Sequence, residues 1–129
     1  MLLIFFFQIW KFKASNNIFS SLTIFEESVV FGCHDHCVYC LQSSNGTLQW
    51  QIKLDSPIFA TPYIYTSADS SPYIVTASTK GYIYILDFVQ IRILSSYKIE
   101  GELFSSPIVF SDKIFIGSRD DHIYCLKIT

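Results

Sequence analysis

Residues 18–41, IFSSLTIFEESVVFGCHDHCVYCL, decide the fold because they recur 85 positions later as residues 103–126, LFSSPIVFSDKIFIGSRDDHIYCL. The two stretches align without a gap. A third copy occupies residues 58–86, with a short insertion around residues 68–72. The spacing gives a period of about 40–45 residues, which is typical of repeat architectures.

Each copy contains short runs of β-branched and aromatic residues separated by turn residues. The runs of the first copy predict strands over residues 18–25, 28–33, 37–41 and 48–54. No stretch shows a helical period of 3.6 residues with caps at its ends. Four strands in a unit of this length form the blade of a β-propeller. The sequence therefore predicts an all-β fold, a partial β-propeller of four-stranded blades.

The composition agrees with stacked blades. Half of the residues are hydrophobic and 16% are charged, compared with roughly 25% charged residues in soluble domains. Strands that are buried on both faces read as continuous apolar runs. A stack of blades buries both faces of its inner sheets, so it accounts for the excess of apolar residues.

The repeats divide residues 1–129, a single repeat region, into about two and a half blades and an N-terminal remnant. The parts are a remnant of a preceding blade, two full repeats and an incomplete third repeat: residues 1–17, 18–57, 58–102 and 103–129. Closed propellers usually have about four to eight blades. We therefore expect a segment of a longer propeller, whose partners are the remaining blades of a parent chain or other protein chains.

Residues 40–50, CLQSSNGTLQW, resemble the A-x-D-x-x-x-G-x-x-x-W tryptophan-docking repeat of pyrroloquinoline-quinone (PQQ) propellers. The Gly, Asp and Tyr-Cys-Leu positions of the repeat are most similar to the C-terminal PQQ-like domain of beta-alanine-activating enzymes, in the acyl-CoA synthetase family. The resemblance implies a quinoprotein-dehydrogenase-like fold in which the Trp of one blade docks on the next blade. The structural repeat positions are Trp10, Trp50, Gly32, Gly117, Asp35, Asp120, Tyr39, Tyr84, Tyr124 and Gly46.

The chain departs from this motif at several positions. Gln42 stands where the motif has Asp, although Asp87 keeps the Asp in the next copy. That next copy has Ile91 and Ser95 in place of Gly46 and Trp50.

Cysteine and histidine residues gather in residues 33–40 with a spacing that zinc sites use. The metal-ligand candidates are Cys33, His34, His36 and Cys37. The other copies replace this set with Ser, Thr, Gly and Tyr, or with Ser, Arg, Asp and His, so only the strand-turn-strand recurs. In a strand, Cys37 and Cys40 would point to opposite faces. We favour a structural role, with Cys40 and Cys125 as buried core residues, over a Cys/His metal-binding module.

The remaining polar candidates also have structural interpretations. Asp35 and Asp120 fall in turns, where an Asp side chain accepts hydrogen bonds from nearby backbone N–H groups. Hydroxyl residues stand at the head of the first strand of each copy, where we expect them to bond backbone groups, a channel ligand being the alternative: Ser20, Ser21, Thr61, Ser105 and Ser106. The sequence contains no catalytic motif, so we predict no catalytic residue and no cofactor site.

The charge pattern argues against nucleic-acid binding, because the net charge is −2 and the Lys and Arg residues are scattered. The apolar start of the chain is shorter than the roughly 20 residues that cross a bilayer, and it lacks signal-peptide features. We therefore expect a cytoplasmic protein with reduced thiols and no membrane association.

The leading functional hypothesis is a non-catalytic binding or scaffold segment, which by resemblance belongs to an adenylating enzyme acting on beta-alanine. One alternative is a fragment of a PQQ-dependent dehydrogenase, although no PQQ-contacting set or calcium site is recognised. The sequence also leaves open a Cys/His metal-binding module and a non-functional gene fragment. The isolated chain is expected to be poorly soluble.

Overall fold

The computed structural model describes residues 2–129, which contain three antiparallel sheets and no helix. The first sheet, blade 1, has the strands β1 (Thr23–Phe25), β2 (Ser28–Gly32), β3 (Cys37–Gln42) and β4 (Leu48–Lys53). Blade 2 has β5 (Tyr63–Thr66), β6 (Pro72–Ala77), β7 (Tyr82–Asp87) and β8 (Arg92–Lys98). Blade 3 has β9 (Ile108–Phe110), β10 (Lys113–Gly117) and β11 (Ile123–Lys127). The all-β prediction is confirmed.

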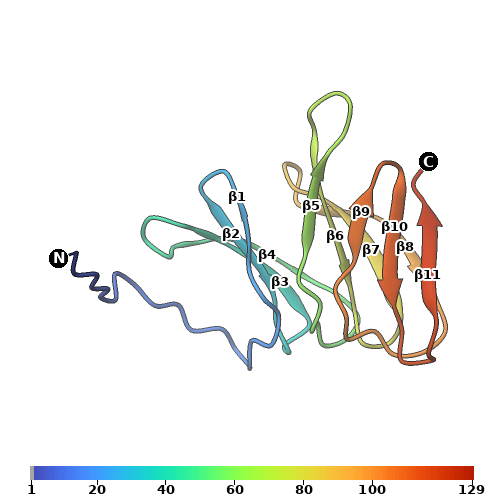
Figure 1. The fold of residues 1–129 in the computed structure, drawn as a ribbon, viewed down its shortest axis with the longest axis horizontal. Coiled ribbons are helices and arrows are strands. Elements are labelled where there is room, and N and C mark those ends of the chain that lie inside the picture. Colours follow the sequence, from blue (N-terminus) through green and yellow to red (C-terminus); the bar gives the residue numbers. More distant parts are fainter. Residues whose placement is uncertain (1) are drawn as a thin grey trace.

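Every sheet is a meander in which consecutive strands are neighbours. The sheets stand side by side in the order blade 1, blade 2, blade 3, with β1, β5 and β9 as the innermost strand of each (Figure 1). Each blade lies within one of the three repeat ranges derived from the sequence. This arrangement is a partial β-propeller.

The first predicted strand is longer than the observed one. We expected a strand over residues 18–25, but β1 begins at Thr23. The reason is that the preceding backbone bonds side-chain hydroxyls rather than a neighbouring strand: the N–H of Ser21 donates to Thr61 Oγ1 at 3.0 Å. Residues 18–22 therefore form hydrogen bonds to the start of blade 2 instead of extending the sheet of blade 1.

Apolar clusters fill the junctions between blades. The junction of blades 1 and 2 contains buried residues from both sheets: Val30, Val38, Cys40, Leu54, Ile58, Ile74, Tyr84 and Leu86. The junction of blades 2 and 3 is built in the same way: Ala60, Val75, Ala77, Ile83, Ile99, Leu103, Ile114 and Ile116. The other face of blade 1 buries Val29, Phe31, Cys33, Cys37, Tyr39 and Leu41 beneath Trp10, Phe12 and Ala14. The middle strands of blades 1 and 2 are thus covered on both faces, whereas every residue of the outer strand β8 is exposed.

The outer face of blade 3 is bare in this structure. Ile123 is 82% exposed, whereas its repeat equivalents Val38 and Ile83 are 0% and 2% exposed. Phe110 is 73% exposed on the same sheet. Cys125 lies on this face and is exposed, so the prediction that it is a buried core residue like Cys40 is wrong. The burial of the Cys position depends on a neighbouring blade that Cys40 has and Cys125 lacks here.

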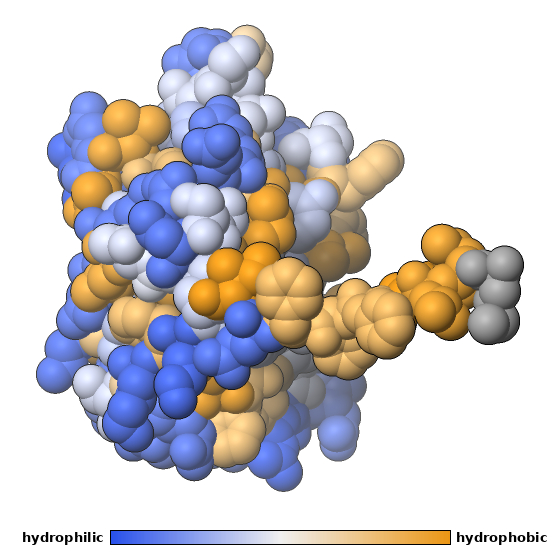
Figure 2. All heavy atoms as spheres, turned by 90° about the vertical axis from the view of Figure 1, so that its left-hand side faces the viewer, coloured by the Kyte–Doolittle hydropathy of each residue, from blue (hydrophilic) through white to orange (hydrophobic). Residues whose placement is uncertain are grey.

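The apolar N-terminal end, which includes Leu3 and Phe6, is exposed and projects from the body of the molecule (Figure 2). Within residues 2–129, no helix has the length and apolar character needed to cross a membrane.

Candidate functional site

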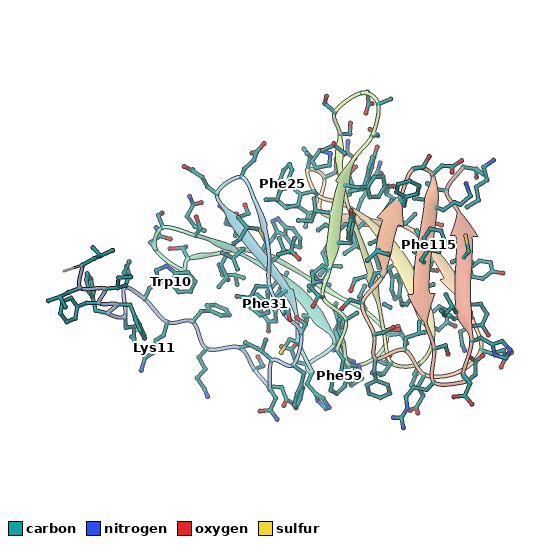
Figure 3. The ribbon with its side chains drawn as sticks, viewed as in Figure 1. Trp10, Lys11, Phe25, Phe31, Phe59 and Phe115 are labelled. Atoms are coloured by element: carbon teal, nitrogen blue, oxygen red, sulfur yellow. The ribbon has the colours of Figure 1, made fainter. Side chains whose placement is uncertain are left out.

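The first feature that repeats from blade to blade is a tryptophan docking position. Trp10 lies against the hairpin that joins β3 and β4 (Figure 3), and its indole Nε1 donates to the backbone oxygen of Ser43 at 2.9 Å. Gly46 lies under the ring: a Cβ added there would stand 2.4 Å from Trp10 Cε3. Gly46 also has φ +73°, which favours glycine. The docking of Trp10 therefore requires Gly46 for two independent reasons.

Trp50 occupies the equivalent position one blade later. It pairs with Cys40 in the register of β3 and β4, and its ring meets Phe88 edge to face at 5.7 Å. Phe88 is the repeat equivalent of Ser43. Both residues follow the third strand of a blade, so each Trp docks at the same place on the next sheet.

The third docking position has lost its tryptophan. Ser95 pairs with Ile85 as Trp50 pairs with Cys40, and Ile128 follows β11 as Phe88 follows β7. The backbone N–H of Ile128 donates to the backbone oxygen of Asp112 at 2.7 Å. In the same way, the backbone N–H of Ser43 donates to the backbone oxygen of Glu27 at 2.8 Å. This one backbone bond of the receiving site is therefore kept on blade 3, but residues 2–129 contain no fourth strand of that blade and no counterpart of the Gly46 turn.

An Asp–Tyr pair is the second repeated feature. The Asp35 carboxylate accepts from the backbone N–H of Cys37 at 3.0 Å and from the hydroxyl of Tyr39. In blade 3, Asp120 accepts from the N–H of His122 at 3.1 Å and from the hydroxyl of Tyr124. Each Asp thereby ties the turn between the second and third strands to the following strand.

Blade 2 forms the same kind of pair with a different Asp. Lys80 stands at the repeat position of Asp35, and the Tyr84 hydroxyl instead donates to Asp55 Oδ1 at 2.6 Å. Asp55 belongs to the connection from blade 1, so this hydrogen bond crosses the junction. Sequence comparison missed Asp55 because the residues at its repeat positions are Ser15 and Glu100, not Asp.

The pKa values of these groups follow from their surroundings. Burial, followed by the hydrogen bond to Asp35, raises the pKa of Tyr39 to about 12. Burial and the Asp55 hydrogen bond raise the pKa of Tyr84 far above its ordinary value. For Asp55, burial acts to raise the pKa, but hydroxyl hydrogen bonds, including that of Tyr84, outweigh it and lower the pKa. The ionised Asp55 and the neutral Tyr84 therefore stabilise each other.

Hydroxyl side chains connect the innermost strands. The N–H of Ser21 donates to Thr61 Oγ1 at 3.0 Å, and the N–H of Thr61 donates to Ser106 Oγ at 2.7 Å. Within a blade, Ser20 and Ser105 donate to the backbone oxygens of Gly32 and Gly117, at 3.1 and 2.7 Å. These hydroxyls have the backbone partners that the sequence interpretation expected.

An aromatic row accompanies the hydroxyls and was not recognised from the sequence. The rings of Phe19, Phe59 and Phe104 follow one another at centroid distances of 4.8 Å. The guanidinium of Arg119 lies 5.0 Å from the Phe104 ring. The signal that could have revealed this row is the Phe that stands two positions before Ser21, Thr61 and Ser106 in the three copies.

The four metal-ligand candidates are not arranged around one point. Cys33 is buried beside the backbone oxygens of Asn16 and Asn17, at 3.5 and 3.4 Å from its Sγ. His34 lies edge-on to Phe19 and Phe59. Burial raises the pKa values of Cys33 and Cys37, which disfavours the thiolate that a metal requires. Among residues 2–129, no three His, Cys, Asp or Glu side chains form a group suited to a metal ion.

Cys37 and Cys40 face opposite sides of β3, as strand geometry predicts: Cys37 contacts the cluster under Trp10, and Cys40 lies in the junction with blade 2. The Cys-x-x-Cys spacing therefore follows from two separate packing positions.

Comparisons with solved structures show the fold. The protein BamB from Moraxella catarrhalis superposes with a TM-score of 0.73 at 20% identity, over 92% of this chain and 36% of BamB. BBS1N, solved in complex with ARL6DN, gives a TM-score of 0.76 at 11% identity, over 92% of this chain and 39% of that chain. Both likenesses support the propeller architecture.

Sequence relatives give the family. The chain is 37% identical over 105 residues to the beta-alanine-activating enzyme of Homo sapiens, covering 80% of this chain and 10% of the relative. The Drosophila melanogaster enzyme of that name is 32% identical over 134 residues, covering 91% of this chain and 13% of the relative. The chain thus spans about a tenth of the length of these relatives. Because the family model for the beta-propeller of beta-alanine-activating enzyme matches residues 7–128, the chain belongs to that beta-propeller family.

Proposed function

We propose that this chain is a non-catalytic interaction segment, whose role is to dock further propeller blades and to form part of a binding or scaffold domain on an adenylating enzyme. The observation that carries the proposal is the bare apolar face of blade 3, where Ile123 is 82% and Phe110 is 73% exposed. Contiguous apolar surface of this kind marks an interaction site.

The chemistry of the face fits a blade of the same repeat type. Ile123 and Phe110 occupy the repeat positions of Ile83 and Tyr65, which pack in the junction of blades 2 and 3. Ser106 occupies the repeat position of Ser21 and Thr61. The backbone N–H groups of those two residues each donate to a side-chain hydroxyl of the next blade. The expected partner therefore presents an apolar sheet face with a Ser or Thr at its inner end.

The relatives are named as enzymes that activate beta-alanine. We place that activity outside this chain, in another part of such a protein, because the hydroxyl, Asp and Tyr groups of the repeat bond the propeller itself. In the expected assembly the propeller supplies binding surface rather than reacting groups. We expect a cytoplasmic location for this assembly.

Sedimentation velocity tests the docking face. The unmodified chain should self-associate or precipitate at tens of micromolar. A Phe110→Arg, Ile123→Arg double variant should sediment as a 14.8 kDa monomer, because two charges interrupt the apolar face. As a matched control, two Arg residues at the exposed positions Gln49 and Gln51 of β4 should leave the association unchanged. A monomeric unmodified chain with a sharp melting transition would refute the proposal.

An adenylation assay tests the catalytic part. The chain alone should support no beta-alanine-dependent exchange of pyrophosphate into ATP. Exchange by the purified chain would show that the propeller contains reacting groups.

A further inference from the structure

The turn that receives Trp10 contains an asparagine followed by a glycine, Asn45-Gly46, and no other asparagine of the chain precedes a glycine. Because glycine has no side chain to hinder it, its backbone nitrogen can attack the side-chain amide carbon of the preceding asparagine. A bond then forms between Gly46 N and Asn45 Cγ, and ammonia leaves with the proton of the Gly46 N–H. Water opens the resulting cyclic imide to an aspartyl or isoaspartyl residue. Asn45 is exposed, so water reaches it.

In the folded turn, hydrogen bonds hold both reacting groups. The Gly46 N–H donates to the backbone oxygen of Gln42 at 2.8 Å. The Asn45 side-chain oxygen accepts from the backbone N–H of Thr47 at 2.9 Å, as in an Asx turn. The backbone N–H of Gln42 closes the turn by donating to the backbone oxygen of Thr47 at 2.8 Å. Formation of the imide consumes the first N–H and reorients the amide that makes the second bond, so the turn has to open before it reacts.

Trp10 holds this turn closed. Its ring covers Gly46 so closely that an added Cβ would stand 2.4 Å from Trp10 Cε3, and its Nε1 donates to the backbone oxygen of Ser43 at 2.9 Å. The segment that carries Trp10 is fixed by Phe12 and Ala14, which pack on the same face of blade 1. The protection of the turn therefore depends on a segment 30 positions and more away in the sequence, and not on the turn alone.

We infer that Asn45 is a deamidation site whose rate is set by the docking of Trp10, with water as the only co-reactant. While the indole is docked, the turn stays closed and Asn45 persists. When the segment around Trp10 leaves blade 1, the turn opens and Asn45 reacts. An isoaspartyl product lengthens the backbone of the turn by a carbon atom, so the groups of Ser43 and Gly46 that meet the indole no longer align with it. Separation of this segment from blade 1 is thereby converted from a reversible event into a permanent one.

Peptide mapping by mass spectrometry measures the deamidation rate, with the Phe110→Arg, Ile123→Arg background incubated at neutral pH. Trp10→Ala should speed the reaction of Asn45 by about tenfold, because local opening limits the rate in the docked chain. Trp50→Ala is the matched control, since it removes an indole from the opposite face of blade 1, and it should leave the rate unchanged. If circular dichroism shows that Trp10→Ala does not fold, Trp10→Phe replaces it, with an expected increase of about threefold. A folded Trp10 variant that reacts no faster than the background, or a Trp50→Ala variant that reacts equally fast, overturns the inference.

Limited digestion with trypsin tests the consequence for docking. Lys11 and Lys13 lie in the segment that carries Trp10, so release of this segment makes its backbone accessible to the protease. The isoaspartyl fraction, separated by chromatography, should be cut there about threefold faster than the background chain. Asn45→Asp has the same charge on a normal backbone and should be cut at the rate of the background chain. Equal cleavage of the isoaspartyl fraction and of Asn45→Asp would show that the product does not release Trp10 and would overturn this part of the inference.

Discussion

Replacing Tyr84 with Phe removes one hydroxyl from the junction between blades 1 and 2. The Tyr84 hydroxyl donates to Asp55 Oδ1 at 2.6 Å, and Tyr84 is only 7% exposed. A hydrogen bond to a charged group contributes roughly 1.5–3 kcal/mol to stability. Because Asp55 is half-buried and keeps its bond from Ser56 at 2.9 Å, we expect the low end, about 1.5 kcal/mol. For a domain of this size, this loss lowers the melting temperature by about 5 °C.

The pH dependence of this loss has a definite sign. The pKa of Asp55 in the folded chain lies below its ordinary value of 3.8. A lowered folded-state pKa stabilises the fold above the unfolded pKa, and that stabilisation disappears as the pH falls through the folded value. The cost of Tyr84→Phe should therefore be constant from pH 7 to pH 5 and should shrink as the pH falls below 3.8.

Urea unfolding followed by tryptophan fluorescence measures these differences. The Phe110→Arg, Ile123→Arg background keeps the chain monomeric, and those sites on blade 3 are far enough from Asp55 for the effects to add. Tyr82→Phe is the control on the same strand. The Tyr82 ring lies 5.8 Å from Lys98 Nζ. Among residues 2–129, no carboxylate accepts a hydrogen bond from the Tyr82 hydroxyl as Asp55 does from that of Tyr84. We expect a change within about 0.5 kcal/mol for that control. A Tyr84→Phe effect equal to the control, or one that grows in acid, would refute the reasoning.

Three further predictions concern backbone space, backbone strain and thiol access. Gly32→Ala should destabilise the chain by about 1–3 kcal/mol in urea unfolding, because the new Cβ would stand 2.3 Å from Ile58 Cγ2. Gly117→Ala is the control and should be tolerated, because the nearest atom to its new Cβ, Ser105 Oγ, is 3.6 Å away. Ile91→Gly should stabilise the chain by about 1 kcal/mol in the same assay, since a β-branched residue at φ 58° is strained; an unchanged midpoint would contradict this. In the Phe110→Arg, Ile123→Arg background, which leaves this face free, Cys125 should react with a thiol reagent within minutes, and the other three cysteines, which are buried, only on unfolding; mass spectrometry would count the labelled sites.

The repeat made much of the fold predictable. Two strands of the first copy were expected over residues 28–33 and 37–41, and β2 and β3 span Ser28–Gly32 and Cys37–Gln42. Their turns are short and recur with the same spacing, and their apolar residues have to be buried wherever the blade stacks. The docking position of Trp50 could also be expected, because it follows from a motif whose geometry is local to one blade and its neighbour.

Features that depend on a particular junction could not be predicted. Asp55 replaces the missing turn Asp of blade 2 only because the connection from blade 1 passes beside Tyr84. Cys125 shares its sequence surroundings with Cys40, yet one is exposed and the other buried, because burial comes from the adjacent sheet. Repeat equivalence thus predicts the position of a side chain in its blade but not the partner it meets across the junction.

The departures of the second repeat from its own pattern fall close together in the sequence. Ile91 adopts a backbone conformation suited to glycine, and Ser95 stands where an indole would fill the junction. Ile91 lies in the turn between β7 and β8, and Ser95 lies within β8. Natural chains tend to violate local folding rules at functional or strained sites. By repeat equivalence Ile91 belongs to the turn of blade 2 that receives Trp50, whereas Ser95 pairs with Ile85, which packs toward blade 3. The two departures therefore affect different junctions, and each junction keeps its apolar cluster without the full Gly and Trp pattern.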